Sequence, residues 1–369
     1  MLHLTTDRLD ALPGADYVAT SIAVDRDDTW KTDHRLALQH GFPSVFSENG
    51  GPGGLSHTLR SVPPMLAVAK DVERLAPNAL LLNYTNPENR VCLAIHRYSN
   101  VRTIGLCHGV ADTTQVVARL FDLPLDDVEL QAVGTNHFVW TTSLTQRSTG
   151  RDLLPLLRER LPHADSATWS FCTTLFDQFG VFPTTGDSHV GEYISYAAEF
   201  IGTKGCDFEL MTRIRDFVTT TVDAWLSGSR PAKELIDSPS HESRLNHGAT
   251  QIMAALIAGT TVRRPSFIIP NRGYVENLPE DAVIEVPGLI ENGDFRGVPV
   301  GRLAAPVAAM VQREIAIEEL AVEAAVTGSR EAALQALLLD PCVHSARAAE
   351  AFLADILTAH RAHLPAFWS

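Results

Sequence analysis

The sequence predicts an α/β protein, with a Rossmann-like, doubly wound sheet followed by a mostly helical α+β domain. Through residues 1–150, short apolar runs alternate with helical stretches at the spacing of βαβ units. Polar clusters directly follow several of these runs, where a parallel sheet collects its ligands. Beyond about residue 150, the sequence changes to longer amphipathic helices, which is typical of a second domain. The domains are therefore predicted at 1–150 and 151–369.

The first domain is predicted from five apolar, partly β-branched runs that read as buried strands. These strands are predicted at 15–24, 79–83, 103–107, 128–133 and 138–144. A Gly/Pro-rich loop at 47–54 leads into a helical stretch that ends near Leu75, with a break or new first turn at Pro63 and Pro64. Pro87 is well placed to open a helix through Tyr98, and a further helix is predicted across 111–121.

The second domain is predicted from the helical period of its apolar residues. Helices are predicted at 152–161, 208–227, 241–258, 302–327, 329–339 and 346–362, with short strands at 266–270 and 282–286. The apolar faces of the long C-terminal helices suit either core packing or a subunit interface. We therefore expect a homodimer or a homotetramer.

The composition is that of a globular chain with room for two domains. It has 369 residues, of which 45% are hydrophobic and 20% charged. The net charge of −14 disfavours nucleic acid and anionic lipid as partners. No apolar run reaches the roughly 18–20 residues of a membrane span, and the first residues do not resemble a signal peptide. With five scattered cysteines and no C-x-x-C pair, the sequence predicts a cytoplasmic protein.

Two polar pairs that follow predicted strands carry the candidate chemistry. They are Cys107-His108 and Asn136-His137. A thiolate and an imidazole are good metal ligands, so Cys107 and His137 could bind one ion if their strands are neighbours. Taken singly, a cysteine at a strand end or a lone histidine is more often a core or surface residue. Further titratable side chains follow at His189, Glu192 and Tyr193.

The strings around these residues resemble glycoside hydrolase family 4, the NAD- and manganese-dependent glycosidases. The strings are Asn83-Tyr84-Thr85-Asn86-Pro87, Gly105-Leu106-Cys107-His108-Gly109-Val110 and Gly134-Thr135-Asn136-His137. Further matches lie at 48–54, 60–63, 189–193, 270–273 and 338–341, in the order of the family and over nearly the whole chain. The resemblance implies a fold of the lactate/malate dehydrogenase-like superfamily, with an incomplete dinucleotide-binding domain at 1–150 and a substrate-binding and oligomerisation domain at 151–369.

The resemblance also implies a redox route to hydrolysis, since family 4 is an exception among glycosidases that use two carboxylates. In the family, NAD⁺ takes a hydride from sugar C3, and a tyrosine then removes the acidified proton at C2. The aglycone at C1 is eliminated, water adds back, and reduction at C3 regenerates the cofactor. A Mn²⁺ ion acts as a Lewis acid on the oxygens of C2 and C3.

The resemblance assigns roles to residues of this chain. It implies that Cys107 and His137 are the metal ligands and that Tyr193 is the base at C2, with Tyr196 as the alternative. It gives His108 a catalytic role at the glycosidic or C2 oxygen, as a possible leaving-group acid. The remaining implied contacts are Asn86 and Ser21 for the cofactor, and Asn136, Arg60, Asn83 and His189 for the substrate.

The residue after the thiol points to the sugar. Members that act on phosphosugars tend to carry Asp or Asn at the position of His108, whereas His marks members that use unphosphorylated sugars. The Cys-His-Gly-Val form favours uronides, and hence an α-galacturonidase or α-glucuronidase. A uronide carboxylate needs a cationic partner, for which Arg60, Lys204 and Arg272 are candidates.

The chain departs from the family at its start, where the family has a Gly-x-Gly-Ser loop for the dinucleotide pyrophosphate. Residues 4–7 already resemble the third strand of the family, so the preceding segment is expected to be missing. An internal start codon is the favoured explanation, over a fragment or a degenerate paralogue. Two other functions stay open: an NAD-dependent 2-hydroxy-acid dehydrogenase, and a non-catalytic sugar-binding or assembly subunit.

Overall fold

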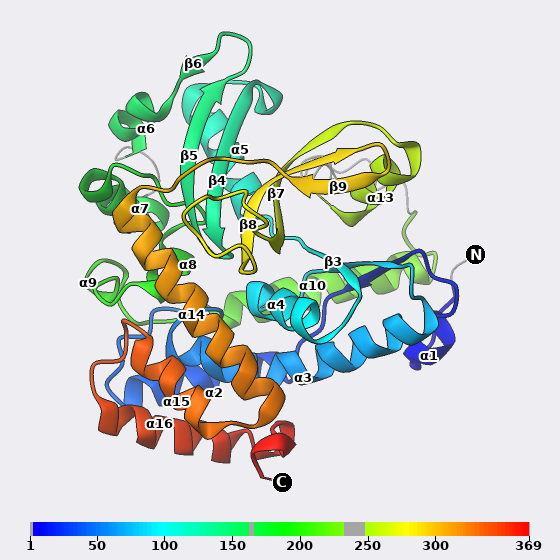
Figure 1. Ribbon diagram of the computed structural model, residues 1–369, viewed down its shortest axis with the longest axis vertical. Helices are drawn as coiled ribbons and strands as arrows, with labels where there is room; N and C mark the ends of the chain where they lie inside the picture. Colours follow the sequence, from blue (N-terminus) through cyan, green and yellow to red (C-terminus); the bar gives the residue numbers. More distant parts are fainter. Residues whose placement is uncertain (1–2, 162–165, 232–247, 369) are drawn as a thin grey trace.

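The computed structural model describes residues 3–161, 166–231 and 248–368. In this part of the chain, nine strands form one mixed sheet with the order β1-β2-β3-β7-β8-β4-β5-β6, and β9 pairs with β8 (Figure 1). The strands are β1 (Tyr17–Thr20), β2 (Leu80–Asn83), β3 (Arg102–Gly105), β4 (Val128–Thr135), β5 (Phe138–Gln146), β6 (Arg151–Asp152), β7 (Val262–Pro270), β8 (Val283–Glu291) and β9 (Asp294–Gly297).

The first three strands form the parallel part of the sheet, as the βαβ spacing predicts. β1 pairs with β2, and β2 pairs with β3, both in parallel. Thr20, Asn83 and Gly105 end these strands in register with one another. The polar segments that follow β2 and β3 therefore start at the same end of the sheet, where the parallel strands have their carboxyl ends. This confirms the Rossmann-like expectation for this part of the chain.

The prediction that the parallel pattern continues through 128–144 is wrong. β4 and β5 form an antiparallel hairpin, and β4 reaches the parallel strands only through the antiparallel strands β8 and β7. The strands that lead to Cys107 and His137 are therefore not neighbours. A strand buried on both faces reads as an apolar run in either direction, so the run alone does not reveal its orientation. The sheet also continues across residue 150, and the division into two domains stays a prediction.

The helices largely follow the predicted periodicity. They are α1 (Arg8–Ala11), α2 (Arg26–Gln39), α3 (Gly51–Leu75), α4 (Glu88–Tyr98), α5 (Gly109–Phe121), α6 (Leu154–Arg160), α7 (Ser166–Phe179), α8 (Asp187–Val190), α9 (Ala198–Ile201), α10 (Phe208–Leu226), α13 (Ala249–Ala258), α14 (Ala305–Thr327), α15 (Arg330–Leu339) and α16 (Ala346–Ala359). The sequence did not predict α2 or α7, and the predicted residues 241–247 lie outside the described residues. In this part of the chain, no helix is both long and apolar enough to cross a membrane.

The predicted break at the two prolines of α3 is also wrong, because the helix continues through Pro63 and Pro64. Two prolines remove only two main-chain donors, and the residues around them pack in the core; Leu59, Val62 and Met65 have no exposed surface. Figure 1 shows α15 and α16 beside α2 and α3, on the side away from the β4–β5 hairpin, and α14 running from α7 towards them. The hydrophobic core around α3 and these C-terminal helices supports the loop that precedes α3.

Candidate active site

Four segments of the chain meet at one place, around the turn of the β4–β5 hairpin. They are the loop before α3, the turn between β3 and α5, the hairpin turn itself, and the segment that includes α8 and the 3-10 helix Gly191–Tyr193. The hairpin turn places His137 in the left-handed region, with φ of 68°. This conformation is uncommon for a residue with a side chain, and such positions often occur at functional sites.

Asn136 lies at the centre of this arrangement. Its main-chain oxygen accepts a hydrogen bond from the Tyr193 hydroxyl at 3.2 Å, and its Nδ2 donates to Glu285 Oε2 at 2.9 Å. Its side chain also lies beside the Cys107 thiol and acts to lower the pKa of that thiol. Burial, with the charges of Glu285 and Glu88, nevertheless raises the pKa of Cys107 well above its usual value. The structure thus brings Cys107, His137 and Tyr193 to one residue, although the strands before the first two are not adjacent.

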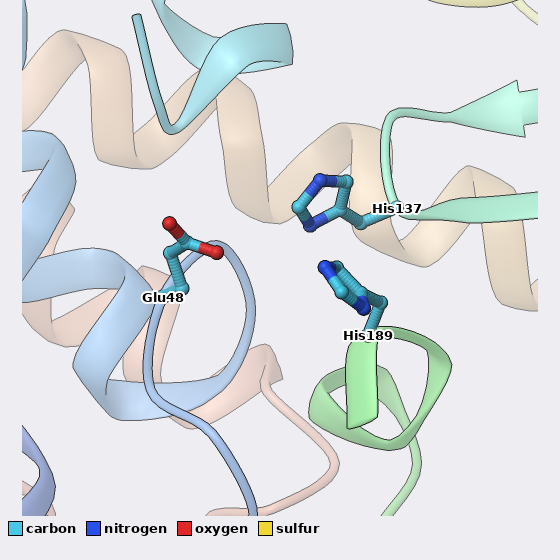
Figure 2. Close-up of side chains that lie close together, drawn as sticks. All are labelled: Glu48, His137 and His189. Carbon is cyan, nitrogen blue, oxygen red and sulfur yellow. The ribbon is translucent and has the colours of Figure 1, made fainter. Parts of the chain in front are cut away.

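A possible metal-binding group lies on the other side of His137. One ligand atom each from Glu48, His137 and His189 lies within 4.8 Å of the other two (Figure 2). Among the described residues, these three form the one cluster of His, Cys, Asp or Glu side chains that could hold a metal ion. The two imidazole rings meet edge to face, with their centroids 4.3 Å apart. Burial lowers the pKa of His137 well below its usual range and that of His189 to about 4, so both rings are neutral at pH 7, the form that binds metals. The group includes the predicted ligand His137, but it does not include Cys107.

The loop that carries Glu48 is held by Glu192. A Glu192 carboxylate oxygen accepts hydrogen bonds from the main-chain nitrogens of Glu48 and Asn49. The Asn49 amide nitrogen lies 2.6 Å from His137 Nδ1. Among the described residues, the buried side-chain oxygens of Asn49 and Asn136 have no hydrogen-bond partner. Two unused acceptors next to His137 suit a ligand with hydroxyl groups or a cation.

Tyr193 fits the predicted base position better than Tyr196 does. The Tyr193 side chain is 2% exposed and stacks on Phe138, with 4.9 Å between the ring centroids. Burial and the nearby Glu192 charge raise the pKa of Tyr193 well above its usual value. Tyr196 is 38% exposed, and its ring packs against Phe171. Of the two phenols, that of Tyr193 is therefore the one that contacts the hairpin turn.

His108 and Cys107 line a cavity of about 660 Å³ together with residues of α5. The His108 side chain is 82% exposed, and its Nδ1 lies 2.7 Å from Asp112 Oδ2. Arg119, two turns further along α5 than Asp112, lines the same cavity. The predicted acid therefore stands over an open space next to the thiol, which is large enough for a sugar.

The predicted cofactor residues lie just beyond the carboxyl ends of the parallel strands. Ser21 directly follows β1 and is exposed, and the neighbouring nitrogen of Ile22 donates to Thr85 Oγ1 at 3.1 Å. The Asn86 amide donates to Glu48 Oε1 at 3.1 Å, so Asn86 adjoins the possible metal group. Both positions agree with a dinucleotide lying along these strand ends, and their contacts stay predictions.

Two predicted substrate residues are engaged within the protein. The Asn83 oxygen accepts from Thr20 Oγ1 at 3.0 Å and from the nitrogen of Thr85 at 3.1 Å, so this amide braces the strand end. Arg60 is 2% exposed, and its guanidinium contacts Asp33 at 2.6 Å. Their predicted contacts with sugar stay predictions. Lys204 and Arg272, the other candidate partners of a carboxylate, line two cavities that contain neither Cys107 nor His137.

Three residues of the site were not assigned a role from the sequence: Glu48, Asn49 and Glu285. Glu48 and Asn49 lie in the 48–54 motif, which marked the segment without singling out its side chains. Glu285 stands in no motif of the sequence. It reaches the site on β8, a strand that the sequence assigns to the second predicted domain. Only the tertiary contacts of these residues reveal them.

The sequence matches known glycosidases over most of its length. Residues 1–123 match the family described as "Family 4 glycosyl hydrolase", and residues 132–343 match its C-terminal domain. An alpha-glucosidase of Erwinia rhapontici is 31% identical over 361 residues, which cover 87% of this chain and 76% of that protein. An alpha-galacturonidase of Bacillus subtilis is 26% identical, over 84% of this chain and 73% of that protein.

Solved structures share the fold. The protein lplD of Bacillus subtilis, which carries the name of a glucosidase, superposes with a TM-score of 0.84 at 26% identity, over 95% of this chain and 85% of that one. A 6-phospho-alpha-glucosidase from gut microorganisms, solved with NAD and Mn²⁺, gives a TM-score of 0.83 at 21% identity, over 97% and 84% of the two chains.

Proposed function

Because the chain belongs to family 4 of the glycosyl hydrolases, we propose that it cleaves α-glycosides of unphosphorylated sugars, with NAD and Mn²⁺ as cofactors. The observation that carries the proposal is the meeting of Cys107, His137 and Tyr193 around Asn136. These are the three groups to which the family resemblance assigns the metal and the proton at C2. Relatives named alpha-glucosidase and alpha-galacturonidase support the sugar class.

The donor set around His137 fits a divalent cation. A thiol, imidazoles and a carboxylate are all available within the site, and neutral imidazole is the form that binds. We propose His137, in the hairpin turn, as the central ligand, and Cys107, in the turn between β3 and α5, as the second ligand. Glu48 and His189 complete the surroundings of His137 and are placed to bind the cation or a sugar hydroxyl. When bound, NAD⁺ would supply a hydride acceptor, and Mn²⁺ would supply a Lewis acid for the sugar oxygens.

Tyr193 is the proposed base that removes the proton from C2. Its hydroxyl is held by the main-chain oxygen of Asn136, which fixes the direction of the phenol oxygen. Its buried position excludes bulk water, and the burial that raises its pKa makes a nearby positive charge necessary for ionisation at neutral pH. The side-chain oxygens of Asn49 and Asn136 are the proposed acceptors for sugar hydroxyls.

His108 is the proposed leaving-group acid, and the cavity beside it is the proposed place of the sugar. For a uronide, the carboxylate needs a cation in this space. Arg119 lines the cavity, whereas Lys204 and Arg272 line other cavities, so Arg119 replaces them as the proposed carboxylate partner. This arrangement supports α-galacturonides or α-glucuronides as the substrates.

The test is hydrolysis of a panel of p-nitrophenyl α-glycosides and α-uronides, supplied with NAD⁺, Mn²⁺ and a thiol reductant. We expect release of p-nitrophenol that stops when EDTA is added and returns with Mn²⁺. Accumulation of NADH without p-nitrophenol would indicate a dehydrogenase instead. Hydrolysis at an unchanged rate in EDTA and without NAD⁺ would refute the proposal.

A further inference from the structure

We propose that Glu285, on β8, is a positioning residue that orients the Asn136 amide and, through it, the Cys107 thiol for a divalent cation. The inference rests on the proposed function, because the cation is the one proposed there. Glu285 lies outside the segments that carry the implied ligands, base and acid. It is nevertheless fully buried at 0% exposure and contacts the residue around which those groups meet.

The hydrogen bonds of Glu285 allow one orientation of the Asn136 amide. Glu285 Oε1 accepts from the Ser266 hydroxyl at 2.6 Å, and Oε2 accepts from Asn136 Nδ2 at 2.9 Å. Because both oxygens of Glu285 act as acceptors here, Glu285 selects the NH₂ end of the amide and rejects the oxygen end. The second N–H of Asn136 is thereby available to the Cys107 thiol, which lies beside this side chain.

The remaining groups of Asn136 are held as well. Its main-chain nitrogen donates to Asn89 Oδ1 at 3.3 Å, and its main-chain oxygen accepts from Tyr193. With its main chain held, Asn136 can only rotate its side chain, and the hydrogen bond to Glu285 prevents this rotation. The side-chain oxygen then faces away from Glu285 and has no partner among the described residues, so it stays available to a ligand.

The buried carboxyl groups around Cys107 also suit a cation. Glu88 is a second buried carboxyl close to Cys107, and it accepts a hydrogen bond from the nitrogen of Leu106. In the described part of the chain, neither Glu88 nor Glu285 forms an ion pair with an arginine or a lysine. Burial raises the pKa of Glu285, and burial with the Glu285 charge raises that of Glu88 well above its usual value, so a cation at the adjacent thiol would favour the ionised form of both. Glu285 thus acts through geometry, by way of its hydrogen bond to Asn136.

The experiment measures Mn²⁺ binding by titration calorimetry for the wild type, E285Q and E285D. E285Q keeps the shape but can present a donor to Asn136, and E285D keeps the charge but withdraws the carboxylate by one methylene. We expect both variants to raise the Kd for Mn²⁺ by roughly 10- to 100-fold, the range typical of residues that orient metal ligands. E314Q is the control, since Glu314 is equally buried but pairs with Arg90, and its Kd should match the wild type.

A second readout follows the thiol itself. Cys107 is the one cysteine of the five that is not buried, so iodoacetamide should label it first. We expect Mn²⁺ to slow this labelling in the wild type and E314Q, and to protect E285Q and E285D much less at the same concentration. Circular dichroism melting identifies any variant that fails to fold, in which case the other substitution at 285 decides.

Three outcomes would overturn the proposal. If E285D binds Mn²⁺ like the wild type and only E285Q is weakened, then charge alone matters. If both variants bind like the wild type, Glu285 has no role at the cation. In both of these cases the proposed function stands. If the wild type itself binds no Mn²⁺ and Cys107 is not protected, the metal-dependent function fails and the positioning role fails with it.

Discussion

At the scale of single residues, Tyr193 gives the sharpest test, because its ring and its hydroxyl have separate tasks. The ring stacks on Phe138, whereas the hydroxyl contacts Asn136 and is the proposed base. Tyr193→Phe keeps the stacking and removes only the hydroxyl. We expect hydrolysis to fall about 10²- to 10⁴-fold, the usual contribution of a general base, and stability to fall by only about 1 kcal/mol.

The matched control is Tyr196→Phe, because the Tyr196 ring is exposed and contacts Phe171 instead of the hairpin turn. Rates of p-nitrophenyl glycoside hydrolysis and urea unfolding curves should be measured for both variants. If Tyr196→Phe loses the activity and Tyr193→Phe keeps it, then the two tyrosines have the opposite assignment.

His57 predicts part of the pH dependence of stability. Its Nδ1 donates to the main-chain oxygen of Glu48 at 2.8 Å, and burial, with the Arg60 charge, lowers the pKa of His57 to about 4. The unfolded chain, with a His pKa near 6.5, binds the proton first as the pH falls. The contribution of His57 to stability is therefore complete above pH 6.5 and is lost between pH 6.5 and 4, by at most about 3.5 kcal/mol at about 1.4 kcal/mol per pKa unit.

His57→Asn should flatten this acid limb, since the Asn amide can donate to the same carbonyl but does not titrate. Urea unfolding from pH 7 to pH 4.5 measures the difference between the two proteins. Equal slopes in this window would show that His57 is protonated alike in the folded and unfolded chains.

The sequence predicted the residues whose neighbours form recognisable strings and missed those that depend on distant segments. Cys107, His137 and Tyr193 each stand in a motif, and the structure brings them together. Asn49 contacts His137, 88 residues further along the chain, and no local pattern encodes that contact. The pairing of Arg60 with Asp33 was missed for the same reason, which is why a substrate role looked open for this buried arginine.

At the scale of elements, a buried ion pair links α2 to α3. Asp33 on α2 is 0% exposed and contacts Arg60 on α3 at 2.6 Å, while His360, directly after α16, lies 2.8 Å from the same carboxylate. Burial alone raises the pKa of Asp33, but the Arg60 charge and the hydrogen bonds lower it overall. The carboxylate is therefore ionised at neutral pH and joins three helices that support the site.

Asp33→Asn should cost about 3–5 kcal/mol of unfolding free energy, because it leaves the Arg60 charge buried without a counterion. Asp294→Asn is the control, because it breaks an exposed ion pair with Arg102. The side chain of Arg102 is 58% exposed and that of Asp294 is 70% exposed, so the substitution should cost no more than about 1 kcal/mol. Urea unfolding at pH 7 compares them. Equal small losses would mean that the buried pair does not stabilise the helix contacts.

Element types were more predictable than their pairing. Helices such as α14 and α16 follow an apolar period that is visible in the sequence, and their bounds were predicted within a few residues. The direction of β4 and β5 was not predictable from two adjacent apolar runs, since parallel and hairpin strands share that pattern when both faces are buried. The metal-ligand prediction assumed neighbouring strands, but β7 and β8 separate β3 from β4, and Cys107 lies beside Asn136, the residue before His137.

At the scale of the whole molecule, one sheet joins segments from both halves of the chain, so a ligand at the hairpin turn should stabilise the entire fold. His137 lies where the loop before α3, the hairpin and the segment around α8 meet, and a cation there binds only the folded arrangement. We expect Mn²⁺ at 100 times its Kd to stabilise the protein by about 2.7 kcal/mol.

This stabilisation should disappear in His137→Ala and persist in His96→Ala, since His96 is exposed on α4 and lines another cavity. Thermal melts with and without Mn²⁺ measure the shift. An equal shift in both variants would place the cation elsewhere on the molecule.

The central claim is that hydrolysis proceeds by removal of the proton at sugar C2, by the phenol held at Asn136. The most direct test is hydrolysis of a p-nitrophenyl α-uronide in D₂O, with NAD⁺, Mn²⁺ and reductant, followed by NMR of the released sugar. The account predicts deuterium at C2 of the product, and its loss together with activity in Tyr193→Phe. A product that carries only the original hydrogen at C2, formed at full rate, would contradict it.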